Sequence, residues 1–281
     1  MLFEKSGYEV LKCHTCGFRY ANFDPGNNFA REFYTDDFFT NGYHKNGYID
    51  YVADERNHKM MATAALKLIE RYVAGGALLD VGCAAGYFLE VLGPAWTPYG
   101  CEPCEAMAIA ARKRFGAGIA HAPFEEYLPE VSFDVVTLWD SLEHVVDPAM
   151  CIRKAHGILR ENGHLFLRTP DAGSPAAIVL GKAWYHYAPP GHLHFFDRKT
   201  ISLLLERNGF RMLRIVYLAR YVSLAEIVIN LGLMLNMQML KDFSGSLMNN
   251  SRWNVTIPYH VFDEMVVVAV KKPGGEKRGR R

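Results

Sequence analysis

Apolar and polar residues alternate along this chain with a period that changes several times. The segment "DERNHKMMATAALKLIERY", residues 54–72, has apolar residues at helical spacing, with Met61, Ala65, Leu68 and Tyr72 on one face. Strand-like runs follow at "ALLDVG", "PYGCE", "FDVVTLWD" and "HLFLRTP", and a helix-like run stands between each of them and the next. This alternation predicts βαβ units and a mostly parallel sheet with helices on both faces.

Helix-start and helix-stop residues flank several of the helix-like runs. "EAMAIAARKRFG" is closed by Gly116, "DPAMCIRKAHGILRENG" has Pro148 near its start and a glycine at its end, and "DRKTISLLLERNG" has Asp197 as its N-cap. Two further strands, "FRMLRIVYL" and "EMVVVAVKK", break the rhythm. Between them we expect a helical insert over about residues 219–261, rich in Met, Leu and Asn, whereas residues 1–30 are predicted to be irregular.

Small residues follow the first strand in "LLDVGCAAGYFLEVLG", residues 78–93. Ligands of a doubly wound sheet lie beyond the carboxyl ends of its strands, and Gly82 and Gly86 let the backbone approach one closely. The spacing fits neither a dinucleotide turn nor a phosphate loop. Because Asp80 precedes the turn and no basic residue lies in it, the turn favours a ligand with an ammonium or sulfonium charge. A helix–strand packing turn without a ligand is the alternative.

The second strand ends in "GCEP" with an acidic residue, Glu102. In a nucleotide-binding fold a carboxylate at this position accepts hydrogen bonds from both ribose hydroxyls. A lone glutamate at a strand end can equally be a surface residue. Its place after the small-residue turn favours the ribose role.

Four stretches taken in order resemble the class I S-adenosylmethionine-dependent methyltransferases: "LLDVGCAAGYFLEVL", "GCEPCEAMAIAAR", "FDVVTLWDSLEHVVDP" and "GILRENGHLFLRTPD". The resemblance runs from about residue 77 to residue 210, and "EMVVVAVKKP" is similar to the family's last strand. It implies an α/β, Rossmann-like, doubly wound sheet of seven strands whose last strand is antiparallel and inserted between its neighbours. It also implies S-adenosyl-L-methionine as cofactor.

The resemblance assigns cofactor-binding roles by position. The residues concerned are Asp80, Gly82, Cys83, Ala84, Gly86, Glu102, Pro103, Phe124 and Asp140. Asp80, Gly82 and Gly86 would line the methionine part, and Glu102 would hold the ribose. Phe124, in "HAPFEE", would lie by the adenine, and Asp140 would lie beneath the methyl-transfer site. Ala84 departs from the glycine of many members, and we expect tighter packing there rather than lost binding.

Histidines after the fourth and fifth strands are the candidate catalytic residues, because a hydroxyl acceptor needs a base and imidazole suits neutral pH. They are His144, in "DSLEHVVDP", and His192 and His194, in "PPGHLHFFD". The second stretch also resembles a P-x-H-x-H-x-F element of small-molecule and glycan-pathway methyltransferases. A hydrogen-bonded structural role is the alternative for each histidine. Glu143, His144 and a neighbouring histidine could instead bind a divalent metal, but their spacing is no metal signature and we predict none.

Two C-x-x-C pairs need separate interpretations. "LKCHTCGFRYANFDP", with Cys13 and Cys16, resembles the second half of a zinc ribbon, but a structural zinc site needs four ligands and no upstream pair is present. Zinc at Cys13 and Cys16 is therefore possible but not expected. Cys101 and Cys104 flank Glu102, and we interpret their spacing as coincidence. The alternatives are redox sensitivity or a metal site shared with the first pair.

Composition supports a folded enzyme-sized chain: of 281 residues, 50% are hydrophobic and 22% are charged, which rules against global disorder. A net charge of +1 does not indicate a nucleic-acid partner. The six cysteines do not suggest a disulfide scaffold, and "MLFEKSGYEV" has no signal-peptide pattern, so we predict a cytoplasmic protein. Residues 221–240 are long enough for a membrane span but contain polar residues. We predict a cap or core helix there, with membrane-surface contact as the alternative.

We therefore predict an N-terminal appendage at residues 1–50 that caps the acceptor side, a methyltransferase domain at 51–272 and a disordered basic tail at 273–281. The predicted function is methyl transfer to a small-molecule or sugar-type acceptor, most simply O-methylation with a histidine base. A nucleic-acid acceptor is disfavoured because "WDSL" stands where an N-P-P-Y-type motif would. The alternatives are a non-catalytic binding protein that uses the insert for partner or membrane contact, and a nicotinamide-dependent oxidoreductase. The sequence does not determine an oligomeric state.

Overall fold

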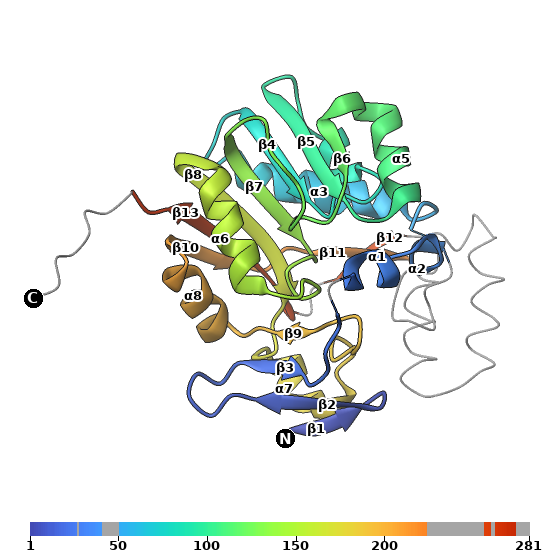
Figure 1. The fold of residues 1–281 in the computed structure, drawn as a ribbon, viewed down its shortest axis with the longest axis vertical. Helices are drawn as coiled ribbons and strands as arrows, with labels where there is room; N and C mark the ends of the chain where they lie inside the picture. Colours follow the sequence, from blue (N-terminus) through green and yellow to red (C-terminus); the bar gives the residue numbers. More distant parts are fainter. Residues whose placement is uncertain (27, 41–50, 224–255, 260–261, 274–281) are drawn as a thin grey trace, which may run out of the picture.

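A seven-stranded sheet forms the centre of the protein (Figure 1). The computed structural model describes residues 1–26, 28–40, 51–223, 256–259 and 262–273. The strand order is β10-β13-β8-β7-β4-β5-β6. The bounds are β4 Gly76–Val81, β5 Trp96–Glu102, β6 Ile119–His121, β7 Phe133–Trp139, β8 Leu159–Pro170, β10 Phe210–Val216 and β13 Glu264–Lys271.

Strand direction explains why the alternation of elements fails near the end of the sequence. Strands β4 to β8 run parallel to one another, whereas β13 lies between β8 and β10 and is antiparallel to both. Val267 of β13 faces Leu167 on one side and Ile215 on the other. The predicted Rossmann-like sheet with an inserted antiparallel last strand is therefore confirmed. The edge strand β6 is only three residues long and showed no clear strand pattern in the sequence.

Helices cover both faces of this sheet, as a doubly wound fold requires. The bounds are α3 Glu55–Ile69, α4 Tyr87–Glu90, α5 Glu105–Phe115, α6 Pro148–Ile158 and α8 Arg198–Arg207, with a 3-10 turn at Gly116–Gly118. Leu79 and Val136 pack with α6 and α8, and their neighbours Leu78 and Val135 pack with α3, α4 and α5. Successive strand residues thus feed two separate cores, which is why these strands are apolar throughout.

The predicted boundary between α6 and β8 was wrong. The helix expected to continue to Gly163 ends at Ile158, and β8 begins at the next residue. Pairing of Leu159 with Phe133 of β7 starts the strand early, so sheet pairing overrides the helical pattern of "ILRENG". The predicted N-cap at Asp197 is confirmed, because its carboxylate accepts a hydrogen bond from the Thr200 backbone N–H at 2.8 Å.

Residues 1–30 are more ordered than predicted, so the expectation of irregular structure was wrong. They contribute three strands to a second sheet of order β1-β2-β3-β9, which lies below the central sheet in Figure 1. The strand bounds are β1 Phe3–Lys5, β2 Tyr8–Lys12, β3 Arg19–Ala21 and β9 His194–Phe195. Near this sheet in the chain are the short helices α1 Phe29–Phe33, α2 Asp36–Thr40 and α7 Pro175–Leu180, and a 3-10 turn at Gly181–Ala183. Such short strands become stable only by pairing, and β3 finds its partner in the distant β9.

The predicted insert begins and ends in an antiparallel ribbon of β11, Arg220–Ser223, and β12, Thr256–Tyr259. Residues 224–255 lie outside the described part of the chain, and so do the predictions of a helical insert and of membrane contact there. The same holds for most of the predicted basic tail. In the described segments, no helix has the length and apolar character needed to cross a membrane.

Replacing Asp197 with alanine should lower the free energy of unfolding by about 1 kcal/mol, because the Asp197 carboxylate no longer accepts the hydrogen bond from the Thr200 backbone N–H at the start of α8. Urea denaturation measures this. Lys199→Ala, an exposed change in the same turn, is the matched control and should stay near wild type. Equal stability of the Asp197 and Lys199 variants would contradict the capping role.

Candidate functional site

The turn from β4 to α4 has an unusual backbone. Gly82, Ala84 and Gly86 have positive φ angles of 72°, 44° and 83°. A Cβ on Gly82 would lie 2.8 Å from the Ser141 Oγ, and one on Gly86 would lie 2.9 Å from the Phe115 Cε2. Both positions therefore need glycine for conformation and for space. Ala84 adopts the left-handed region despite its side chain, which is a local strain that the sequence did not reveal.

Glu102 ties this turn to the next strand. Its two carboxylate oxygens accept hydrogen bonds from the backbone N–H groups of Ala84, at 2.9 Å, and Cys104, at 2.8 Å. The residue is 3% exposed, and burial raises the pKa of its carboxyl to about 7. Each oxygen keeps a second lone pair, so Glu102 can hold its own loop and still accept from a ligand.

Asp80 is the second buried acid of the site. Its Oδ1 accepts a hydrogen bond from the Thr137 hydroxyl at 2.7 Å, which joins the ends of β4 and β7. Burial, with the nearby Glu102 as a smaller cause, raises the pKa of Asp80 to about 7. Two acids gathered at one sheet edge, with no basic residue in the turn, suit a cationic ligand that offers hydroxyl groups.

Asp140 directly follows β7 and has a positive φ of 50°. Its carboxylate binds the Arg168 guanidinium in a two-point ion pair, with Nε donating to Oδ1 at 2.7 Å and Nη2 donating to Oδ2. The next residue, Ser141, donates to the Val81 carbonyl at 3.0 Å. This hydrogen bond joins the loop after β7 to the end of β4, where the turn to α4 begins. Arg168 was missed in the sequence, although a charge at the carboxyl end of an apolar strand is a signal.

The remaining predicted cofactor residues differ in their surroundings. Cys83 is buried and its sulfur lies under Gly100, where an added Cβ would approach it to 2.6 Å, so this side chain packs on the sheet. The Pro103 carbonyl lies 3.1 Å from the His121 Nε2. Phe124 is 5% exposed within the core and has the Lys154 ammonium 5.2 Å from its ring centre. Most of the Phe124 ring is thus occupied by protein contacts.

Two of the three predicted histidines lie side by side. The ring centres of His144 and His192 are 4.7 Å apart. The His144 Nδ1 lies 2.9 Å from the Gly191 carbonyl, and the His192 Nδ1 lies 2.8 Å from the His186 carbonyl. Because carbonyls only accept, Nδ1 carries the proton in each neutral ring and Nε2 keeps its lone pair. Burial lowers the pKa of both imidazoles.

Glu143 completes this cluster. It is 1% exposed, and neither carboxylate oxygen has a hydrogen-bond partner among the described residues. The Thr169 hydroxyl faces it from outside hydrogen-bond geometry. One ligand-capable atom each from Glu143, His144 and His192 lie within 4.8 Å of one another. Burial raises the pKa of Glu143 well above its usual range. We call these three residues the E143–H144–H192 cluster.

His194 is oriented differently. Its Nε2 donates to the Val145 carbonyl at 2.9 Å, its ring stacks on Phe18 with centres 5.6 Å apart, and its Nδ1 is buried without a partner in the described structure. Neither ring nitrogen of His194 is therefore placed to take a proton from a methyl acceptor. The structure brings His144 and His192 together and leaves His194 in a packing position between the two sheets.

Aromatic residues of the N-terminal segment cover the site. Phe38 and Phe39 of α2 pack in one cluster with Ala84 and Ala85 of the turn. The Tyr34 hydroxyl lies 2.7 Å from the His144 Nδ1 and donates to the Gly191 carbonyl at 3.2 Å. No sequence pattern linked Tyr34 to His144, because the contact joins segments far apart in the chain.

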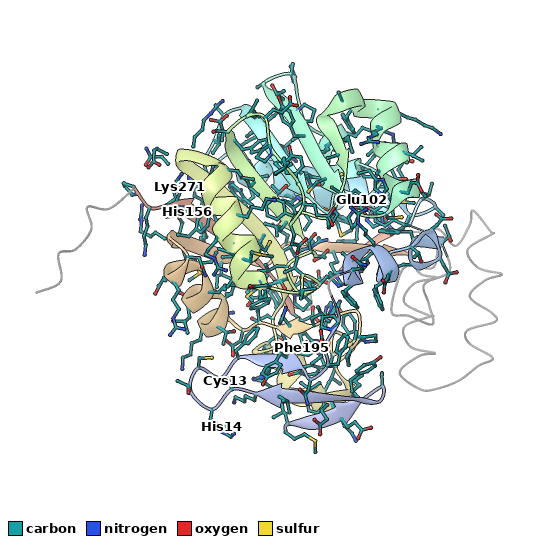
Figure 2. All side chains as sticks on the ribbon, in the orientation of Figure 1. Cys13, His14, Glu102, His156, Phe195 and Lys271 are labelled. Carbon is teal, nitrogen blue, oxygen red and sulfur yellow. The ribbon has the colours of Figure 1, made fainter. Side chains whose placement is uncertain are left out.

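The two cysteine pairs are widely separated. Cys13 and Cys16 lie in the turn between β2 and β3, and Figure 2 shows Cys13 far from Glu102, which Cys101 and Cys104 flank. A metal site shared by the two pairs is therefore wrong. Within the described ranges, Cys13 and Cys16 do not belong to any group of three potential metal ligands. Cys101 and Cys104 are buried, and burial raises the pKa of both thiols, which opposes a redox role.

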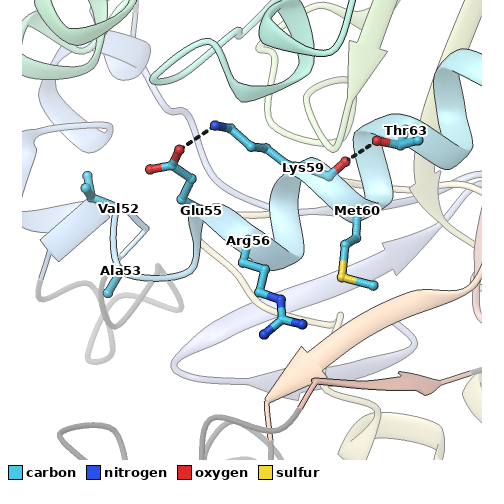
Figure 3. Close-up of a pocket in the computed structure, with 7 residues that line it drawn as sticks. All are labelled: Val52, Ala53, Glu55, Arg56, Lys59, Met60 and Thr63. Atoms are coloured by element: carbon cyan, nitrogen blue, oxygen red, sulfur yellow. Dashed lines mark hydrogen bonds and ion pairs between the residues drawn. The ribbon is translucent and has the colours of Figure 1, made fainter. Parts of the chain in front are cut away.

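A surface hollow of about 580 Å³ lies along the first turns of α3 (Figure 3). It is lined by Val52, Ala53, Glu55, Arg56, Lys59, Met60 and Thr63. Figure 3 shows the Glu55–Lys59 ion pair at its edge, at 2.5 Å. None of the predicted site residues lines it, and the buried acids and histidines lie elsewhere.

Comparisons with known proteins give a consistent result. Residues 53–215 match the family described as "Methyltransferase domain". An enzyme named ubiquinone biosynthesis O-methyltransferase from Pseudomonas paraeruginosa is 32% identical over 136 residues, which is 45% of this chain and 59% of that protein. Its namesake from Xanthomonas axonopodis is 34% identical over 137 residues, 44% of this chain and 56% of that protein. This chain thus spans less than two thirds of the length of these curated relatives.

Solved structures share the fold at low identity. A SAM-dependent methyltransferase from Archaeoglobus fulgidus is 17% identical, with a TM-score of 0.51, over 79% of this chain and 99% of that one. A magnesium protoporphyrin IX methyltransferase from Synechocystis, crystallised with bound S-adenosylhomocysteine, is 16% identical with a TM-score of 0.51 over 86% and 100% of the two chains. At these identities the likeness concerns the fold.

Asp80→Asn should make the protein more stable than wild type above pH 7, by about 1–3 kcal/mol. Because the folded-state pKa of Asp80 is raised to about 7, the fold favours the protonated form and loses stability as pH rises from about 4 to 7. The asparagine Oδ1 can keep the Thr137 hydrogen bond. Urea denaturation at pH 5 and pH 8 measures the difference, with the exposed Glu206→Gln as control. A stability difference that is the same at both pH values would mean that Asp80 titrates as an exposed acid does.

Proposed function

Because this chain belongs to the methyltransferase domain family, we propose that it transfers the methyl group of S-adenosyl-L-methionine to a hydroxyl oxygen of a small-molecule acceptor. The observation that carries the proposal is the pairing, at one sheet edge, of a turn built around buried Asp80 and Glu102 with the E143–H144–H192 cluster. Ser141 connects the two, since it contacts the turn and lies two residues before Glu143.

The residues of the turn suit the cofactor. S-adenosyl-L-methionine, when bound, supplies an electrophilic methyl group on a sulfonium. The spare lone pairs of Glu102 would accept the ribose hydroxyls, and Asp80 would lie on the methionine side with Gly82 and Gly86. The glycines at positions 82 and 86 keep this turn free of side chains, so its backbone can approach the ligand closely. The absence of basic residues in the turn fits a cationic ligand better than a pyrophosphate.

The acceptor side is supplied by the N-terminal segment and by the loops after β7 and β8. We propose that residues 1–50 act as the acceptor-side cap of a domain at 51–272. The aromatic rings of Tyr34, Phe38 and Phe39 near the turn and the cluster favour a flat or partly apolar acceptor over a highly polar one. The curated relatives are named as O-methyltransferases, which supports oxygen as the target atom. A sugar-type acceptor is the alternative that the "PPGHLHFF" resemblance supports.

The proton of the acceptor hydroxyl must leave before or during transfer, and the E143–H144–H192 cluster is where we place that event. His144 and His192 both keep an Nε2 lone pair, whereas His194 uses its Nε2 to hold the Val145 carbonyl. We therefore propose His144 or His192, rather than His194, as the base.

Titration calorimetry of the full chain with S-adenosylmethionine, S-adenosylhomocysteine and NADH tests the cofactor assignment. We expect binding of the two sulfur ligands and none of NADH. Glu102→Ala should weaken binding of both sulfur ligands by about 1–3 kcal/mol, because charge-assisted hydrogen bonds are lost. Glu105→Ala, an exposed change just inside α5, is the control. A folded protein that binds neither sulfur ligand would favour the non-catalytic alternative.

His144→Asn and His192→Asn should each lower turnover about 100-fold or more, because asparagine can keep the Nδ1-type hydrogen bond but has no Nε2. His194→Gln keeps the Nε2-type bond to Val145 and should reduce turnover far less. The rate of S-adenosylhomocysteine release with a phenolic acceptor, selected from a panel, measures this. If turnover fell more in the His194→Gln variant than in the other two, the choice of His144 and His192 would be overturned.

A further inference from the structure

The E143–H144–H192 cluster has a feature that a proton-accepting histidine alone does not need. Glu143 is 1% exposed, yet both of its carboxylate oxygens lack a hydrogen bond in the described part of the structure. A buried carboxylate without partners is costly, and native proteins retain such groups where a ligand or ion satisfies them. Among the described residues Glu143 thus offers two carboxylate oxygens that a bound ligand or ion could satisfy.

Both imidazoles of the cluster are fixed in the tautomer that a metal requires. The Nδ1–H of His144 is held by the Gly191 carbonyl, and that of His192 is held by the His186 carbonyl. Metal-binding histidines commonly donate the proton of one ring nitrogen to a carbonyl in this way, which orients the other nitrogen and its lone pair. The backbone thus supplies the outer support of a metal site for both rings.

We propose that Glu143, His144 and His192 bind one divalent first-row transition metal ion. A carboxylate with two imidazoles suits Zn²⁺, Fe²⁺, Co²⁺ or Mn²⁺ better than Mg²⁺ or Ca²⁺, which prefer oxygen ligands. The three ligand-capable atoms lie within 4.8 Å of one another. Atoms that share one metal at about 2.1 Å lie roughly 3–3.5 Å apart, so the three side chains would have to approach one another somewhat to hold the ion.

Three protein ligands leave coordination positions open, which is the arrangement of a catalytic rather than a structural metal. The role of those positions rests on the function proposed above: an acceptor hydroxyl bound there would have a lowered pKa. Its O–H bond breaks, the proton passes to water, and both bonding electrons stay on the oxygen that the metal holds. With the metal bound, His144 and His192 serve the proposed function as its ligands and lower the pKa of the acceptor hydroxyl through it, whereas without the metal one of them takes the proton as the base proposed above.

Titration of the full chain with Co²⁺ after chelator treatment tests the site directly. We expect one Co²⁺ per chain, with visible ligand-field bands and no thiolate charge-transfer band. Glu143→Gln and His192→Asn should each weaken Co²⁺ binding about 100-fold or more. His192→Asn can keep the bond to the His186 carbonyl, so it separates ligand loss from loss of folding. The Cys13→Ser, Cys16→Ser double variant should retain wild-type affinity.

Two results would overturn the metal site: no Co²⁺ binding by wild type, or binding that both cluster variants retain and the cysteine double variant loses. Calorimetry with S-adenosylhomocysteine on the same samples keeps the two proposals apart. Cofactor binding without Co²⁺ binding overturns the metal site and leaves the proposed function standing. Co²⁺ binding that depends on Glu143, without cofactor binding, supports the metal site and overturns the proposed function.

Discussion

Two backbone hydrogen bonds to the Glu102 carboxylate hold together the edge of the sheet on which the rest of the site depends. They join the turn after β4 to the start of α5, and they do so with an acid that is 3% exposed. The bonds offset part of the cost of burying a carboxylate, and burial still raises its pKa to about 7. Stability is thus given up at the place where a hydroxyl-bearing cation would be bound, which is typical of functional sites.

The acids near Glu102 differ in how the protein holds them. Arg168 binds the Asp140 carboxylate and the Thr137 hydroxyl binds Asp80, whereas Glu143 has no hydrogen-bond partner among the described residues. Two of these neighbouring acids are therefore held by the protein, and the carboxylate of the third can accept from a ligand. The imidazoles beside Glu143 are held by backbone carbonyls of the loop between the 3-10 turn at Gly181–Ala183 and β9, so their orientation depends on that loop rather than on the central sheet.

The small N-terminal sheet explains how this loop is positioned. β3 pairs with β9, and the Tyr34 hydroxyl contacts both His144 and the Gly191 carbonyl. The N-terminal segment and the central domain thus share one hydrogen-bonded network around His144. The same segment also packs on the turn after β4 through Phe38 and Phe39, so a change in it can reach both His144 and that turn.

The sequence by itself determined most strands of the central sheet, the N-cap at Asp197 and the positions of Asp80 and Glu102, because local periodicity and turn chemistry specify these features. The insertion of the last strand between its neighbours was implied by the resemblance to the class I methyltransferases. Only the tertiary structure decided the order in residues 1–30, the early end of the helix at Ile158, the pairing of His144 with His192 and the isolation of Glu143. These depend on contacts between segments far apart in the chain. Hydrogen bonds that join such segments leave no periodic signal in either one, so the sequence could name the histidines but could not choose among them.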